Sequence, residues 1–167
     1  VENTIDAGER MLALYPYDSF TVANLISAYL VADDTQMAID TATNFLTLNP
    51  VATIIYELRR DAHDEIGEDA LADFDQLVLD AFDQERDGDY DDAIDLMEEA
   101  IALVENEDLP IINQSFALWN MARFQLIDGD TNDAIMALET SLELNPDFGP
   151  AYFLLGLAFQ FQFNFED

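Results

Sequence analysis

Apolar residues recur along this chain at intervals of three and four positions, and short polar stretches with glycine or proline separate the runs. This spacing places the apolar side chains on one side of a helix, and the long alternating runs typical of strands are missing. The pattern predicts an all-α protein. The expected helices cover 2–14, 19–32, 35–47, 52–66, 69–87, 90–104, 111–127, 131–143 and 148–163.

Two pairs of similar segments indicate an internal repeat. The stretch DGDYDDAIDLMEEAI (87–101) matches DGDTNDAIMALETSL (128–142), and DTQMAIDTATNFLTLNP (34–50) ends like TNDAIMALETSLELNP (131–146). In both pairs a tight turn leads into a helix that opens with a small alanine, which lets two helices approach closely. Pro16 and Pro50 each follow an apolar helix ending and stand 34 residues apart.

A 34-residue helix–turn–helix unit with alanine opening the second helix and proline after it resembles the tetratricopeptide repeat. The family's pattern has packing residues at places 4, 7, 8 and 11 of the first helix, at places 20, 24 and 27 of the second, and proline at place 32. Counting from Ser19, Ser115 and Gly149 as place 1 puts on these places Val22, Leu25, Ile26, Tyr29, Ala38, Ala42, Phe45 and Pro50; Leu118, Met121, Ala122, Gln125, Ala134, Leu138, Ser141 and Pro146; and Tyr152, Leu155, Gly156 and Phe159. The stretch 87–101 adds the corner of another unit, with Ala81, Ala93, Met97 and Ala100 in place.

The resemblance implies an α-solenoid of antiparallel helix pairs with a right-handed superhelix, formed as one domain over 1–167. It departs from the regular pattern twice. Ala38 and Ala93 stand 55 residues apart, which is 21 more than one repeat, so we expect a divergent or extra helix around 51–73. Ala93 and Ala134 stand 41 residues apart, and we expect the surplus in a loop around 105–110, ENEDLP.

Both ends of the chain match half of a repeat. Residues 1–16 align with a second helix and residues 149–167 with a first helix, so that Val1 falls on place 17 and Asp167 on place 19. One hypothesis is that the tail of one copy and the head of the next complete a repeat, and such head-to-tail contacts build a filament or a closed ring. The other is that the sequence is one segment of a larger chain. The expected assembly interface is Ile5, Gly8, Met11, Leu12, Tyr152, Leu155, Gly156, Phe159 and Phe163.

The resemblance also implies a concave groove lined by first helices, which would bind a peptide segment of another protein. Its residues would be Phe20, Asn24, Phe82, Arg86, Phe116, Trp119, Asn120, Arg123, Phe153 and Phe161. Asparagine pairs with peptide backbone, and tryptophan and arginine are favoured anchors at interfaces. A peptide-binding adaptor is therefore the alternative function, although the absence of lysine argues against a lysine clamp for acidic tails.

The net charge of the chain limits the kinds of partner that it can bind. The chain has 36 acidic residues, five arginines and no lysine, giving a formal net charge of -31. Such a field repels nucleic acids and anionic lipid surfaces, so we expect a protein partner and no membrane insertion. The composition is typical of salt-rich habitats, with an ordinary acidic protein as the alternative. The compartment stays open, with the extracellular or periplasmic space favoured.

The sequence contains only weak signals for a metal site or a catalytic site. Read as a calcium loop, DQERDGDYDDAI from Asp83 has oxygen ligands at positions 1, 3 and 5 and Gly88 at position 6, but Ile94 replaces the bidentate glutamate. A repeat corner is the favoured interpretation. His63 is the one histidine, beside Asp61, Asp64 and Glu65, and we interpret it as exposed or locally paired. With no cysteine, no phosphate-binding glycine loop and no nucleophile elbow, we expect no metal, no cofactor and no enzymatic activity.

Overall fold

The computed structural model of the chain describes residues 1–164, with side chains described through Gln162. The described part is helical, without a strand. The helices are α1 (Glu2–Leu14), α2 (Ser19–Val31), α3 (Thr35–Leu46), α4 (Thr53–Ile66), α5 (Asp69–Asp87), α6 (Tyr90–Asn106), α7 (Ile111–Asp128), α8 (Thr131–Leu144) and α9 (Gly149–Asn164). The expected all-α fold is confirmed.

The chain divides into two compact units, Val1–Gln76 and Leu77–Asp167. The division lies inside α5, directly after the stretch 51–73, which contains α4 and the first residues of α5.

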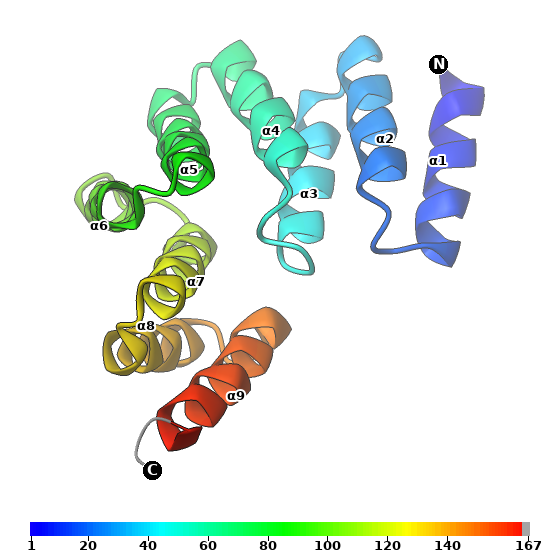
Figure 1. The fold of residues 1–167 in the computed structure, drawn as a ribbon. Helices are drawn as coiled ribbons and strands as arrows, with labels where there is room; N and C mark the ends of the chain where they lie inside the picture. The colour runs from blue at the N-terminus through cyan, green and yellow to red at the C-terminus, as the bar shows by residue number, and fades with distance from the viewer. Residues whose placement is uncertain (165–167) are drawn as a thin grey trace. The chain divides into compact units, whose positions relative to one another are not determined.

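In the first unit, consecutive helices pack against each other from α1 to α4, and α2 also packs against α4 (Figure 1). The connections are only a few residues long, which makes consecutive packed helices antiparallel. The residues on the expected packing places are buried, among them Val22, Ile26, Ala38 and Ala42. Helix α4 begins three residues after Pro50, as α2 begins three residues after Pro16, so both stand where a first helix follows the repeat-ending proline. These two first helices touch directly across α3, as in stacked helix pairs.

The second unit repeats this arrangement. Helix α6 packs against α7, α7 against α8, and α8 against α9, while α7 also packs against α9. Ala93, Met97, Ala122 and Leu138 are all fully buried on the places that the repeat predicts for them. The fold is therefore an all-α solenoid of antiparallel helix pairs.

The stretch 83–94 forms a repeat corner. Helix α5 continues through Asp83 and Glu85 to Asp87, Gly88 follows with φ 87°, and α6 begins at Tyr90. Asp83 accepts a hydrogen bond from Arg86 at 2.7 Å, and Glu85 pairs with Arg123. These side chains are helical and paired, so they do not surround an ion, and the described residues contain no cluster of three or more metal-binding side chains.

The surplus residues between Ala93 and Ala134 lengthen two helices. Glu105 and Asn106 continue α6, and α7 begins at Ile111, so the connection is limited to Glu107–Pro110. Helices α6 and α7 have 17 and 18 residues, against 13 and 12 in α2 and α3. Asp108 has φ 52° in this connection.

A buried polar network joins α3, α4 and α5 within the first unit. The Arg59 guanidinium donates to both carboxylate oxygens of Asp75, at 2.9 Å from Nε to Oδ2 and 2.5 Å from Nη2 to Oδ1. Its Nη1 donates to Thr43 Oγ1 at 3.2 Å, and its Cζ atom lies 5.5 Å from the Tyr56 ring centre. His63 is buried too, and its Nδ1 lies 2.7 Å from Glu68 Oε2, so it is paired with Glu68 rather than with its sequence neighbours.

Candidate interaction surfaces

Helix α9 exposes a side that is covered in the first helices α2 and α7. Tyr152 is 56% exposed and Phe159 38% exposed, Gly156 is exposed, and Leu155 is half-buried. The same places in α2 are all buried next to α3, and they are Val22, Leu25, Ile26 and Tyr29. In α7 they are Leu118, Met121, Ala122 and Gln125, of which three are buried and Met121 is half-buried. The open side of α9 is therefore the side that packs against a second helix elsewhere in the chain.

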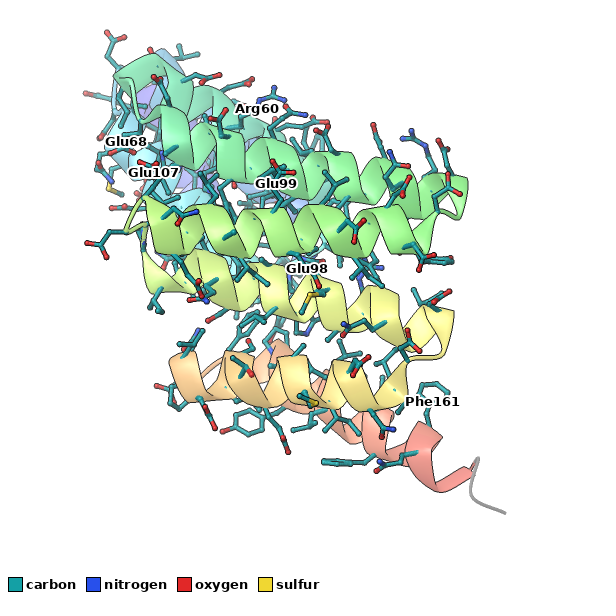
Figure 2. All side chains as sticks on the ribbon, turned by 90° about the vertical axis from the view of Figure 1, so that its left-hand side faces the viewer. Arg60, Glu68, Glu98, Glu99, Glu107 and Phe161 are labelled. Carbon is teal, nitrogen blue, oxygen red and sulfur yellow. The ribbon has the colours of Figure 1, made fainter. Side chains whose placement is uncertain are left out.

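The opposite side of α9 is buried. Ala151, Leu154 and Ala158 form this buried side, where α9 packs against α7 and α8. Phe161 lies toward the end of the helix and is exposed (Figure 2). No residue of α9 carries a charge. The helix is therefore uncharged on both the covered and the open side.

Helix α1 has two apolar stripes. Ile5, Gly8 and Leu12 are half-buried on the side toward α2, where a Cβ at Gly8 would lie 3.0 Å from Leu25 Cδ1. Glu9 on the same side accepts a hydrogen bond from the Tyr29 hydroxyl at 2.7 Å. The second stripe is exposed and comprises Thr4, Ala7, Met11 and Leu14.

The exposed stripe of α1 matches a buried surface in α3. Thr4 and Met11 stand on places 20 and 27, and in α3 these places hold Ala38 and Phe45, which are buried. Alanine and phenylalanine are covered there because α3 lies against its first helix, α2. The exposed stripe is therefore the surface on which a second helix meets the first helix of its own repeat.

The expected assembly residues thus fall into three groups. Met11, Tyr152, Gly156 and Phe159 are exposed, while Ile5, Gly8 and Leu12 contact α2 and Leu155 is half-buried. The side chain of Phe163 lies outside the described residues. Sequence reasoning missed Leu14, which is strongly exposed and lies three residues beyond Met11 on the same stripe.

Several expected groove residues are occupied by internal contacts. Phe116 and Asn120 are fully buried: the Phe116 ring centre lies 5.8 Å from that of Phe148, and Asn120 Nδ2 donates to the Phe116 carbonyl at 3.0 Å. Arg86 is exposed but pairs with Asp83. Phe20, Asn24, Phe153 and Phe161 are exposed.

Arg123 is the centre of a small cluster in the second unit. Its guanidinium makes a bidentate pair with Glu85, with 2.7 Å between Nη2 and Oε2, and lies 4.6 Å from the Phe124 ring centre. Phe82 meets Phe124 edge-on at 6.4 Å between centres. Phe124 was missed from sequence, because an aromatic residue on a helix interior gives no sign of the cation that will lie over it.

Two buried donors on α7 have no hydrogen-bond partner within the described residues. They are Nε1 of Trp119 and Nε of Arg123, which lie one helical turn apart. Such groups are uncommon, since a buried donor without a partner destabilises the folded state. Both donors lie among the expected groove residues, and both are shielded from solvent in this structure.

Comparison with known proteins yields a structural resemblance. No family model matches the chain, and no curated protein matches it. Two solved structures described as crystal structures of MamA are similar to 95% and 93% of this chain, over 71% and 75% of their own chains. Each is 22% identical in sequence, with TM-scores of 0.39 and 0.37. Neither resemblance is close enough to carry a function over to this chain.

The arginines leave the surface charge almost uncompensated. Each of the five lies beside a carboxylate: Arg10 with Asp6, Arg59 with Asp75, Arg60 with Asp61, Arg86 with Asp83, and Arg123 with Glu85. Acidic residues such as Glu98 and Glu99 on α6 are exposed (Figure 2). Within the described residues, no helix combines the length and apolar character needed to cross a membrane.

Proposed function

We propose that this protein is a self-assembling scaffold whose copies join head to tail. The open side of α9 receives the exposed stripe of α1 from the next copy, and the two helices complete one helix pair. The observation that carries the proposal is the exposure of Tyr152, Gly156 and Phe159, because the residues on the same places in α2 and α7 are buried or half-buried.

The energetics favour such a contact. Fully burying one large apolar side chain stabilises an association by about 1.5–3 kcal/mol before the entropy of association is subtracted. Tyr152 and Phe159 on one side and Met11 and Leu14 on the other are all available for burial. A glycine at place 8 of α9, with open space around its missing Cβ, lets the incoming helix approach closely.

Two variants that each block one end test the proposal most directly. Phe159→Glu blocks α9 and leaves α1 intact, while Met11→Glu blocks α1 and leaves α9 intact. We expect each variant alone to be monomeric by analytical ultracentrifugation, and an equimolar mixture to form a heterodimer and nothing larger. The unchanged protein should form longer species visible by negative-stain electron microscopy.

The matched control is Met136→Glu, which adds the same charge at an exposed apolar residue of α8. This variant should assemble like the unchanged protein. Assembly that survives both Phe159→Glu and Met11→Glu would disprove head-to-tail pairing through these helices. A monomeric unchanged protein at every concentration and salt would do so as well.

A peptide-binding adaptor is the second candidate, and the unpartnered donors of Trp119 and Arg123 favour it. Because both atoms are shielded from solvent in the free protein, a peptide would have to displace neighbouring side chains before its carbonyl oxygens reach them. The test is selection of peptides from a random display library, followed by titration of each hit into the Trp119→Phe variant, which keeps an aromatic ring but lacks Nε1. Equal affinity for both proteins would exclude this site.

A further inference from the structure

The way in which first helices pack within each unit predicts an additional contact between copies. Helix α2 touches α4, and α7 touches α9, although a second helix lies between them in sequence. Each first helix therefore has one side toward the preceding first helix and another side toward the following one. Comparing the same places in different helices identifies both sides.

The side toward the preceding first helix contains place 6. In α9, which packs against both α8 and α7, places 3, 6 and 10 are buried. In α2, which packs against α1, places 3 and 10 are buried, whereas place 6, Asn24, is exposed. The difference between the two helices assigns place 6 to the contact with a preceding first helix.

Two exposed apolar residues accompany Asn24 on this side of α2. Phe20 is 76% exposed and Val31 is 72% exposed, four residues before and seven residues after Asn24. Residues at these intervals lie on the same face of a helix. The face is not covered by any helix of the first unit.

The side toward the following first helix contains place 5. This place is half-buried in α2, as Ala23, and buried in α7, as Trp119, and both helices have a following first helix. In α9 the same place is Phe153, which is 70% exposed. Phe153 is thus open on the side of α9 where a following first helix would pack.

The distribution of charged residues indicates which partner covers these open sides of α2 and α9. Of the helices that the structure describes, α2 and α9 are the two without a charged side chain. Copies that each carry a net charge of -31 repel one another, and the repulsion is weakest where the facing helices are uncharged. Aromatic residues exposed on an uncharged helix are suited to contact with another copy of this chain.

We propose that α9 of one copy also packs against α2 of the next copy, with Phe153 lying against Phe20 and Asn24. This inference rests on the head-to-tail pairing of α9 with α1 and extends it to a three-helix junction. In this arrangement Phe20, Asn24 and Phe153 lie in the contact between copies and not in a peptide-binding groove.

Engineered cysteines test the junction, because the natural chain has no cysteine to interfere. A disulfide forms only between Cα atoms about 4.4–6.8 Å apart, so linkage reports close approach. Chains with Phe153→Cys and chains with Asn24→Cys are mixed under mild oxidation and separated on a non-reducing gel. We expect a linked dimer in the mixture and little in either chain alone.

Two further mixtures separate the possible outcomes. Phe159→Cys with Met11→Cys reports the pairing of α9 with α1, and Met136→Cys with Asn24→Cys is the unlinked control. Linkage of Phe159 to Met11 without linkage of Phe153 to Asn24 overturns the α2 contact and leaves the proposed function standing. Absence of both links overturns both.

A binding measurement provides a second test that needs no oxidation. Phe20→Glu should raise the dissociation constant of the junction at least tenfold, while Met136→Glu should leave it within twofold. Both substitutions are at exposed residues, so the fold is retained in each. An unchanged constant for Phe20→Glu would contradict the contact.

Discussion

At the scale of single residues, the first unit depends on a charge pair taken out of water. Arg59 and Asp75 are both almost fully buried, yet each hydrogen-bonds with the other and Arg59 also reaches Thr43. Burial raises the pKa of Asp75 above its ordinary value, while the charge and hydrogen bonds of Arg59 act in the opposite direction. Removing both side chains should therefore reduce the stability of the protein less than removing one of them.

Arg59→Leu should destabilise the protein by about 3–5 kcal/mol, because it leaves the Asp75 carboxylate buried without its cation. The double variant Arg59→Leu with Asp75→Leu should recover a large part of that loss. Urea unfolding followed by circular dichroism measures both. A double variant as unstable as the single one would show that shape, rather than charge, is what the pair provides.

Tyr29 makes the stability of the folded state depend on pH in the alkaline range. Burial, the hydrogen bond to Glu9 and the nearby carboxylates raise its pKa from 10.0 to about 12. The folded state therefore keeps the hydroxyl proton that the unfolded chain loses. The resulting stabilisation is complete below pH 10 and disappears as the pH rises from 10 to about 12.

We expect the free energy of unfolding to fall over this pH range, and to fall less steeply in Tyr29→Phe, which has no hydroxyl to titrate. Urea unfolding at several pH values provides the comparison. The difference between the two proteins removes the contribution of the other five tyrosines. Identical slopes would mean that Tyr29 titrates alike in the folded and unfolded chains.

At the scale of helices and corners, glycine acts in opposite ways at two positions. Gly88 joins α5 to α6 with φ 87°, a conformation that residues with a side chain rarely adopt. Gly156 lies inside α9, where glycine is a poor helix former. Neither position has an atom within 4 Å of where a Cβ would be, so crowding decides neither outcome.

Gly88→Ala should therefore destabilise the protein by about 1–2 kcal/mol, while Gly156→Ala should stabilise it by about 0.5–1 kcal/mol. The measurement is thermal or urea unfolding of the two variants side by side. Alanine occupies the same place as Gly156 in α7, as Ala122, so assembly through α9 should survive. Effects of the same sign would show that backbone conformation is not the deciding term.

At the scale of the whole molecule, charge opposes the association that the exposed aromatic residues favour. Every copy carries a net charge of -31, and all of its arginines are already beside carboxylates of the same chain. Association then depends on apolar burial at uncharged helices, with repulsion from the remaining surface. Screening of that repulsion should be the main effect of salt.

Raising sodium chloride from 0.1 M to 1 M should therefore promote assembly, since the screening length falls from about 10 Å to about 3 Å. Light scattering of the unchanged protein and of Phe159→Glu checks this, and only the unchanged protein should respond strongly. Dissociation on adding salt would instead indicate that ion pairs hold the copies together.

The sequence by itself determined which segments are helical. The expected ranges 2–14 and 69–87 coincide with α1 and α5, and the other helices begin and end within two residues of expectation. Turn glycines, helix-ending prolines and apolar spacing are local signals that act within a few residues. The repeat pattern added which residues pack inside each helix pair, and Ala38, Ala93 and Ala134 are buried as it requires.

Only the tertiary structure decided which apolar residues remain exposed. Ile5 and Met11 look alike in sequence, yet one faces α2 and the other faces solvent. Phe116 and Phe20 occupy the same place in two first helices, but the first is buried beside Phe148 and the second is exposed. The pairing of Arg59 with Asp75 likewise joins two helices. In each case the outcome depends on neighbours that are distant along the chain, and these determine what a helix covers.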